Sequence, residues 1–355
     1  MQNTIPIKNI LRQLKADLIG KDSYRGVTLT YSWLANQLGH FTLGFIPTLV
    51  LYNILVRYSH FEHKVQIAVL AVSLFWTIFE CYNFLGPLLL ARQSKSNLIY
   101  IPGAKYVFAP QWLNIGFDTL TDVVFFTFGA LVSGKLIDSD EISFLACITP
   151  AILLAVPSYY WYTTKIIMQE AKYPTQFRLS QSNFSIKDED VETISTFRKS
   201  EAKGTHLFIF GGKKSGKTAL AIGLGTEASI KHSNVTYTTG MKLFNLFACS
   251  ESAAAADTGE LWTWRTAELL IVDDINPGPP FEGEIITPDL FVQLMGNQQT
   301  RQDENRLALI NKTVIWVMGN ETGDNGLLRS WKEMLMGIGT PAANIYSVNL
   351  GFQHR

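Results

Sequence analysis

The sequence lacks the features of a protein that is stabilised by disulfides or a structural metal ion, or that binds nucleic acid. Its three cysteines, Cys81, Cys147 and Cys249, have no metal-ligand spacing and imply no disulfide framework. Lys and Arg number 30 and so do Asp and Glu, so no basic excess favours nucleic acid and no acidic excess favours disorder. What remains is a chain of 355 residues, long enough for two domains of ordinary size.

The first 30 residues are polar and basic, without the apolar core or small-residue cleavage site of a signal peptide. Their basic residues are Lys8, Arg12, Lys15, Lys21 and Arg25. We therefore expect residues 1–30 to form a basic amphipathic segment on the cytoplasmic side of a membrane.

Charge is sparse from Tyr31 to Ile167 and dense from Gln169 onward, which indicates lipid as the first solvent and water as the second. A bilayer core requires roughly 20 apolar residues per helix. The sequence offers four such runs, whose apolar residues continue round the whole helix. They are Leu34–Val56, Val65–Ala91, Leu113–Leu136 and Ser143–Ile167. A four-helix transmembrane domain is predicted over residues 31–168.

Positive charge in the connections predicts the orientation of the four spans. The N-terminal segment is basic, and so is the second connection, with Arg92, Lys95 and Lys105. The third connection is acidic, with Asp138 and Asp140. The best fit places both ends of the chain in the cytoplasm, and four spans require that both ends lie on the same side. The expected location is the bacterial inner membrane.

Ionisable side chains inside a membrane span are costly, and they mark functional sites by default. This sequence has four: His40, Glu80, Asp118 and Asp122. The helical rise places all four on the order of 10–20 Å from the cytoplasmic ends of their spans. Asp118 and Asp122 are four residues apart and share one helix face. A polar cluster that binds a cation, passes protons or holds a headgroup is predicted, with a purely structural polar network as the alternative.

Two stretches of this half carry a resemblance. Leu38–Arg57, LGHFTLGFIPTLVLYNILVR, resembles the first motif of the YjdF-like bacterial membrane proteins, and Phe117–Gly134 is similar to that family's DTxxD…GA segment. Glu80 falls where the family has an acidic residue, and the spacing from Asp122 to Gly129 is distantly similar to VanZ-like proteins. The resemblance covers roughly residues 32–135 and implies that the four ionisable residues form the family's polar core.

The segment Gly211–Thr218, GGKKSGKT, is the strongest signal in the second half. It follows the apolar, strand-prone run Thr205–Phe210 and precedes a helix-forming run, which is the context that makes the G-x-x-x-x-G-K-[ST] pattern a P-loop. Such a loop binds phosphate through backbone N–H groups and a helix N-terminus. We expect the nucleotide contacts at Gly211, Gly212, Lys213, Lys214, Ser215, Gly216, Lys217, Thr218 and Ala219.

Lys217 is predicted to reach the β- and γ-phosphates of ATP, and the Thr218 hydroxyl to ligate Mg²⁺. The apolar run Ala267–Asp274 ends in two acids, at the carboxyl end of a predicted buried strand. Asp273 is expected to hold Mg²⁺ with Thr218. Asp274 stands where many hydrolases have Glu, and we expect it to polarise the attacking water, with slow or assembly-dependent turnover.

A third strand, Lys312–Asn320, ends in a polar amide. It resembles the strand of AAA-like ATPases that senses the γ-phosphate, which gives Asn320 the sensor role. Arg329 follows in a helix-like run, where such proteins often carry an arginine finger for a neighbouring subunit; Arg301 and Arg306 are rivals for that role. The double acid and the membrane helices are also similar to KAP-type and STAND-type NTPases.

With strands near Asn234–Thr238 and Ile345–Leu350, the second half is predicted to be an α/β P-loop NTPase domain with a mostly parallel five-stranded sheet. It spans residues 204–355. The polar linker, residues 169–203, includes a short helix at Asp188–Lys199.

The sequence thus predicts a membrane-embedded ATP-binding protein, an ATPase whose nucleotide state controls or assembles the membrane domain. A non-hydrolysing nucleotide-gated switch or channel-like effector is one alternative, and a membrane-tethered DNA-associated ATPase is another. No Asn-Lys-x-Asp motif follows the acids, which favours ATP over GTP. The expected partners are the nucleotide, the bilayer, further copies of the chain and an unidentified protein, with nucleic acid disfavoured.

Overall fold

The computed structural model describes two units, one of helices and one of mixed helices and strands, divided after Ile166. The described residues are 5–19, 27–89, 91–92, 99–100, 108, 111–181, 186–200, 203–248, 260–276, 286–295, 300–318 and 325–350.

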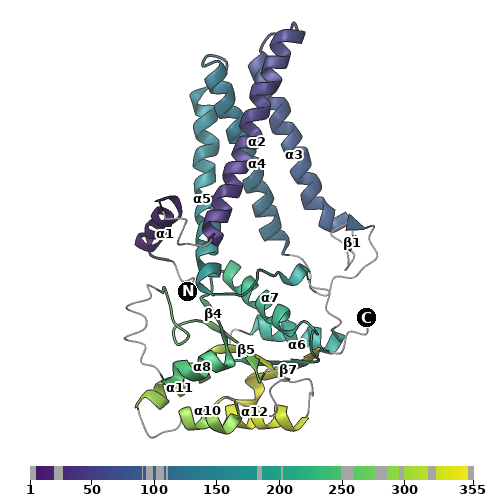
Figure 1. Ribbon diagram of the computed structural model, residues 1–355. Helices are drawn as coiled ribbons and strands as arrows, with labels where there is room; N and C mark the ends of the chain where they lie inside the picture. Colours follow the sequence, from purple (N-terminus) through teal and green to yellow (C-terminus); the bar gives the residue numbers. More distant parts are fainter. Residues whose placement is uncertain are drawn as a thin grey trace. The chain divides into compact units, whose positions relative to one another are not determined.

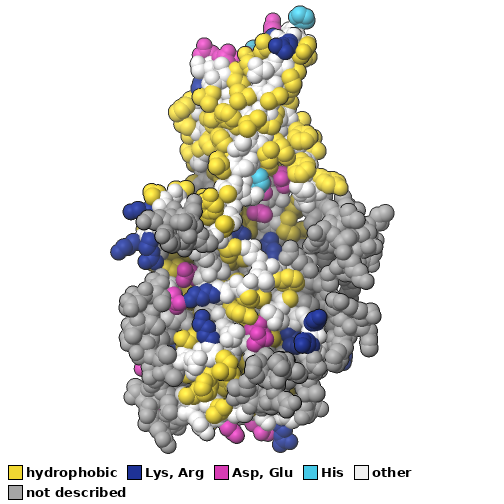
Figure 2. Space-filling view, in the orientation of Figure 1, with side chains coloured by type: hydrophobic (Ala, Val, Ile, Leu, Met, Phe, Trp, Pro, Cys, Tyr) yellow, Lys and Arg dark blue, Asp and Glu magenta, His cyan; other side chains and the backbone are white. Residues whose placement is uncertain are grey.

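Long apolar helices make up most of the first unit (Figure 1). Its elements are α1 (Ile7–Ile19), α2 (Leu29–Tyr58), α3 (Lys64–Leu89), the short antiparallel pair β1 (Ala91–Arg92) and β2 (Ile99–Tyr100), α4 (Trp112–Ile137) and α5 (Phe144–Glu170). Four helices of the described part, α2 to α5, are long and apolar enough to cross a membrane, and they coincide with the four predicted runs. Hydrophobic side chains cover most of the surface that these helices present in Figure 2.

Helices α2 and α4 approach each other closely because both carry glycine at their crossing. A Cβ atom at Gly44 would lie 2.0 Å from the carbonyl oxygen of Phe126. A Cβ atom at Gly129 would lie 2.0 Å from the carbonyl oxygen of Phe41 on the facing helix. Small residues at such positions let helix backbones pack in contact, which is a main source of association between helices in lipid.

This contact predicts that alanine at either position loosens the helical unit. Gly44→Ala and Gly129→Ala are expected to lower the free energy of unfolding by about 1–3 kcal/mol, because the added methyl overpacks the crossing. Gly39→Ala is the matched control on α2, since a Cβ there meets nothing within 4 Å. Unfolding by dodecyl sulfate in mixed micelles measures the difference. Equal stability of the Gly44 and Gly39 variants would show that the crossing is not this close.

The second unit is an α/β domain with one parallel sheet, as predicted. Its elements are η2 (Leu179–Gln181), α6 (Asp188–Lys199), β3 (His206–Gly211), α7 (Lys217–Ile230), β4 (Val235–Thr239), α8 (Gly240–Ala248), β5 (Leu269–Ile275), α10 (Pro288–Leu294), α11 (Thr300–Ile310), β6 (Thr313–Met318), α12 (Asn325–Ile338), η3 (Ala342–Asn344) and β7 (Ile345–Leu350).

The five strands run in the order β4-β5-β6-β3-β7, and every pairing is parallel. The three central strands are almost wholly buried, as expected for a sheet covered by helices on both faces (Figure 1). Alternate residues divide between the faces. Phe208, Leu270 and Trp316 enter a core with residues of α8, α10 and α12, whereas Ile271 contacts Gly225 of α7 on the other face.

Parallel strands present their carboxyl ends at one edge, so the ends of β3, β5 and β6 lie side by side there. Because β6 lies between β3 and β5, its carboxyl end stands between the carboxyl ends of those two strands. The linker helix predicted at Asp188–Lys199 is α6, whose Ile194 and Phe197 are buried.

Candidate functional site

The loop between β3 and α7 turns sharply, through backbone conformations that favour glycine. Gly211 has φ +146° and Gly216 has φ +92°, while Lys214 between them has φ +65°. A Cβ at Gly211 would lie 2.3 Å from the carbonyl oxygen of Leu350 on β7, so only glycine allows the chain to turn at this point. The loop therefore has the curled backbone that the sequence pattern predicts.

The ammonium group of Lys217 folds back over this loop. Its Nζ donates to the carbonyl oxygens of Gly211 and Gly212, at 2.8 and 2.9 Å. The side chain is half-buried at the first position of α7, where the N-terminal N–H groups of the helix create positive potential. A cation and a helix N-terminus thus meet at one loop, and both attract a phosphate group.

Ser215 adds a polar group within the same loop. The residue is 4% exposed, and its hydroxyl has no hydrogen-bond partner among the described residues. A buried hydroxyl without a partner is costly, and a bound oxyanion would satisfy it. The loop as built therefore fits a phosphoryl group.

The carboxylate of Asp273 accepts three hydrogen bonds at this edge of the sheet. Asp273 is 1% exposed at the end of β5. It accepts hydrogen bonds from the Thr218 hydroxyl at 3.2 Å, the Tyr237 hydroxyl at 2.6 Å and the backbone N–H of Asp274 at 2.8 Å. The two predicted Mg²⁺ ligands, Thr218 and Asp273, are thus in direct contact.

The donor set at this contact is one carboxylate and one hydroxyl. Within the described residues, no group of three or more His, Cys, Asp or Glu side chains is arranged to hold a metal ion. Mg²⁺ keeps several of its waters and takes few protein ligands, since substrate phosphates supply others. The pair therefore suits Mg²⁺ carried by a nucleotide better than a resident metal ion.

Asp274 lies within β5 with φ +51°, at an irregularity in the pairing of β5 with β6 between Val272 and Ile275. Its side chain is exposed at the same edge. Partial desolvation and the negative charge of Asp273 raise the pKa of the Asp274 carboxyl, and the positive charge of Lys217 opposes this. The carboxyl therefore lies within electrostatic reach of both Lys217 and Asp273.

Tyr237 of β4 was not identified from the sequence. Desolvation, followed by its bond to Asp273, raises the pKa of the phenol, so the hydroxyl stays protonated and donates. The backbone N–H of the same residue donates to the carbonyl oxygen of Ala171 at 2.9 Å. Ala171 directly follows the last residue of α5, so one residue of β4 joins the end of α5 to Asp273.

The prediction for Asn320 lies outside the described residues, and so does the side chain of Arg301. The other two predicted arginines pair with acidic residues on their own helices. The side chain of Arg329 is 80% exposed on α12 and pairs with Glu333 of the same helix at 2.7 Å. Arg306 pairs with Asp303 on α11 at 3.1 Å.

In the helical unit, the predicted polar cluster centres on a contact between α2 and α4. Nδ1 of His40 lies 2.9 Å from Oδ1 of Asp122, and both side chains are about one-sixth exposed, at 16% and 15%. Glu80 of α3 is buried and accepts from the Asn83 amide at 3.5 Å. His40 interacts electrostatically with Asp122, Glu80 and Asp118, although Asp118 itself is exposed. The four predicted residues therefore share one neighbourhood of this unit.

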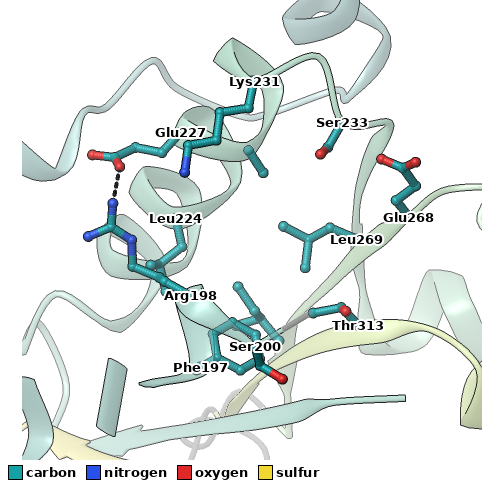
Figure 3. A pocket seen from close by; sticks show the side chains of 12 residues that line it. Phe197, Arg198, Ser200, Leu224, Glu227, Lys231, Ser233, Glu268, Leu269 and Thr313 are labelled. Atoms are coloured by element: carbon teal, nitrogen blue, oxygen red, sulfur yellow. Dashed lines mark hydrogen bonds and ion pairs between the residues drawn. The ribbon is translucent and has the colours of Figure 1, made fainter. Parts of the chain in front are cut away.

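A separate pocket lies at the opposite, amino edge of the sheet (Figure 3). It encloses about 210 Å³ between the end of α6, the end of α7 and the starts of β5 and β6. Arg198 of α6 is ion-paired with Glu227 of α7 beside it. This pair attaches the linker helix to the helix that follows the phosphate-binding loop.

No family model matches the chain, and no curated protein matches it. Among solved structures it is similar to one described as the crystal structure of DnaI. That match has 11% sequence identity and a TM-score of 0.33, and covers 54% of this chain and 93% of that chain. The P-loop-like fold of the second unit is defined by the strand order and the loop geometry above, independently of this likeness.

The bond from Tyr237 predicts a cost for its removal. Tyr237→Phe leaves the buried Asp273 carboxylate one donor short, which is expected to lower the free energy of unfolding by about 1–3 kcal/mol. Tyr346→Phe serves as the control, because Tyr346 lies on β7 and its ring packs against Phe197 of α6. Urea unfolding of the detergent-purified chain measures both. If the two variants lost equal stability, the Tyr237 hydroxyl would contribute nothing specific to Asp273.

Proposed function

We propose that the chain is a membrane-embedded ATP-binding protein, an ATPase whose nucleotide state controls or assembles the helical unit. The observation that carries the proposal is the convergence of Lys217, Thr218 and Asp273 on one edge of a parallel sheet. A magnesium nucleotide is bound by groups of these kinds: a glycine turn, a helix N-terminus, a cation and a buried carboxylate.

Each residue has a distinct part in this proposal. Lys217 releases the loop carbonyls and holds phosphate oxygens, while the loop N–H groups and the Ser215 hydroxyl complete the cradle. Thr218 and Asp273 hold Mg²⁺. ATP supplies the phosphoanhydride bond, and the absence of a guanine-reading motif favours it over GTP.

Asp274 is proposed to orient and polarise the attacking water. It stands at the correct edge of the sheet, exposed and within electrostatic reach of Lys217. Asn320 follows β6, whose place between β3 and β5 supports the role of a γ-phosphate sensor. Arg329 projects from α12 into solvent, which supports its use as a finger toward a neighbouring copy in a homo-oligomer.

The helical unit is proposed to span the bacterial inner membrane with the chain's N-terminus and the α/β unit in the cytoplasm. The length and apolarity of α2 to α5 and the basic charges of the connections support this arrangement. The functional site of the membrane domain is then the cluster of His40, Glu80, Asp118 and Asp122. Ionisable groups in a membrane span mark sites that bind an ion, a proton or a lipid headgroup.

The coupling between nucleotide and membrane helices is proposed to run through Tyr237. Its hydroxyl bonds Asp273, and its N–H bonds Ala171 at the end of α5. Two hydrogen bonds, both made by Tyr237, therefore connect Asp273 to the residue that follows α5. A change in the ligands of Asp273 can reach the end of the last apolar helix through them. The Arg198–Glu227 pair offers a second route, from α7 to the linker helix.

The alternative is a switch that binds ATP without hydrolysing it. The observation that favours it is Asp274, which stands where many hydrolases have the longer Glu and which has a left-handed backbone conformation within β5. In that case binding alone changes the state of the helical unit.

Steady-state hydrolysis by the detergent-purified chain separates the two functions. Lys217→Ala is expected to lower kcat/KM for ATP by about tenfold to a hundredfold, because a charge-assisted hydrogen bond contributes roughly 1.5–3 kcal/mol. Lys242→Ala, an exposed lysine on α8, is the matched control and should behave as the wild type.

Turnover that persists unchanged in Lys217→Ala would contradict the proposed ATPase site. Tight ATP binding without turnover, lost in Lys217→Ala, would instead establish the switch.

A further inference from the structure

Helix α1 presents an apolar stripe that no described residue of its unit covers. Ile7, Leu11 and Leu18 are 69%, 58% and 67% exposed. They are separated by four and seven residues, so they lie along one face of the helix. Large apolar side chains gathered in this way on a helix surface mark a contact with lipid or with another protein.

A basic stripe runs beside the apolar one. Lys8, Arg12 and Lys15 are all exposed, at spacings of four and three residues. The only acidic residue of α1 is Asp17, and it is buried. The exposed surface of the helix therefore carries three positive charges and no negative charge. Figure 2 shows Lys and Arg side chains gathered at the place of α1.

Asp17 ties the helix to the ends of two apolar helices. Its carboxylate accepts hydrogen bonds from Thr28 at 2.9 Å and from Tyr162 at 3.1 Å, and also from Thr30. Thr28 caps the start of α2, and Tyr162 lies in the last turns of α5. All these donors are neutral hydroxyls, so the contact fixes the place of α1 without using its cations.

This attachment decides which partner the stripe fits. The start of α2 and the end of α5 are where two candidate membrane spans leave the apolar region, so α1 is held at that boundary. The surface of a membrane leaflet offers acyl chains to the apolar stripe and headgroup phosphates to the basic stripe. The acyl chains lie deeper than the phosphates, so a helix lying in the surface can contact both at once.

We infer that α1 is an interfacial helix that binds an anionic leaflet surface, with Ile7, Leu11 and Leu18 among the acyl chains and the three cations on lipid phosphates. The inference rests on the proposed membrane placement of α2 to α5. It makes α1 a membrane-surface element attached to the first and last spans by one buried carboxylate.

The test uses the full chain in proteoliposomes, with Cys81, Cys147 and Cys249 replaced by serine. A single cysteine carrying an environment-sensitive fluorophore is placed at Leu11, at Asn9 on another face of α1, or at Leu153, an exposed apolar position of α5. We expect blue-shifted emission at Leu11 and quenching by shallow nitroxide lipids, with neither at Asn9. Both effects should be stronger in phosphatidylcholine vesicles that contain phosphatidylglycerol. Lys8→Gln, Arg12→Gln and Lys15→Gln together should remove that lipid dependence.

Quenching at Leu153 but not at Leu11 would overturn the inference and leave the membrane placement intact. A Leu11 label that is blue-shifted but not quenched by lipid would also overturn it, because protein would then cover the stripe. If the Leu153 label were also unquenched by nitroxides deep in the acyl chains, the proposed membrane placement would be wrong.

Discussion

The buried carboxylate of Asp273 is the constraint on which the α/β unit depends. A carboxylate that is 1% exposed is stable only if donors replace the water it has lost. Here the donors come from the start of α7, from β4 and from the backbone of Asp274. Satisfying this one group therefore fixes the helix after the glycine loop, the neighbouring strand and the irregularity of β5 at Asp274. The geometry of the candidate site follows from that requirement.

In the helical unit, too, a polar contact depends on how closely two elements pack. Gly44 and Gly129 let α2 and α4 approach in contact, and one turn before Gly44, His40 reaches Asp122. The ring of His40 also lies against Phe126, with 4.8 Å between centroids. Close backbone packing thus creates the polar contact, and the polar contact in turn fixes the register of the two helices. In both units, glycine lets two backbone segments approach closely, and a polar contact forms beside them: His40 with Asp122 in the helical unit, and Lys217 with the glycine loop in the α/β unit.

The sequence was most informative where local pattern determines structure. The runs of apolar residues predicted the four long helices, and the strand–loop–helix context of Gly211–Thr218 predicted a turn whose strained angles the structure contains. The parallel five-stranded sheet was predicted as well, and it is parallel throughout.

Contacts between segments far apart in the chain were beyond such patterns. Tyr237 lies in a strand with no motif, and its bond to Asp273 depends on β4 lying beside β5. The bond from Tyr237 to Ala171 spans the linker and could not be read from spacing. Asp118 and Asp122 share a face by spacing, yet Asp118 is exposed and Asp122 contacts His40, because burial depends on the neighbouring helix.

The central claim, a magnesium-nucleotide site built on Thr218 and Asp273, is tested most directly by equilibrium binding of a non-hydrolysable ATP analogue to the detergent-purified chain. The titration is done with and without Mg²⁺, on the wild type and on Asp273→Asn. We expect Mg²⁺ to tighten binding to the wild type. This dependence should be lost in the variant, which retains weak binding through the loop. Absence of binding, or the same Mg²⁺ dependence in both proteins, would contradict that claim.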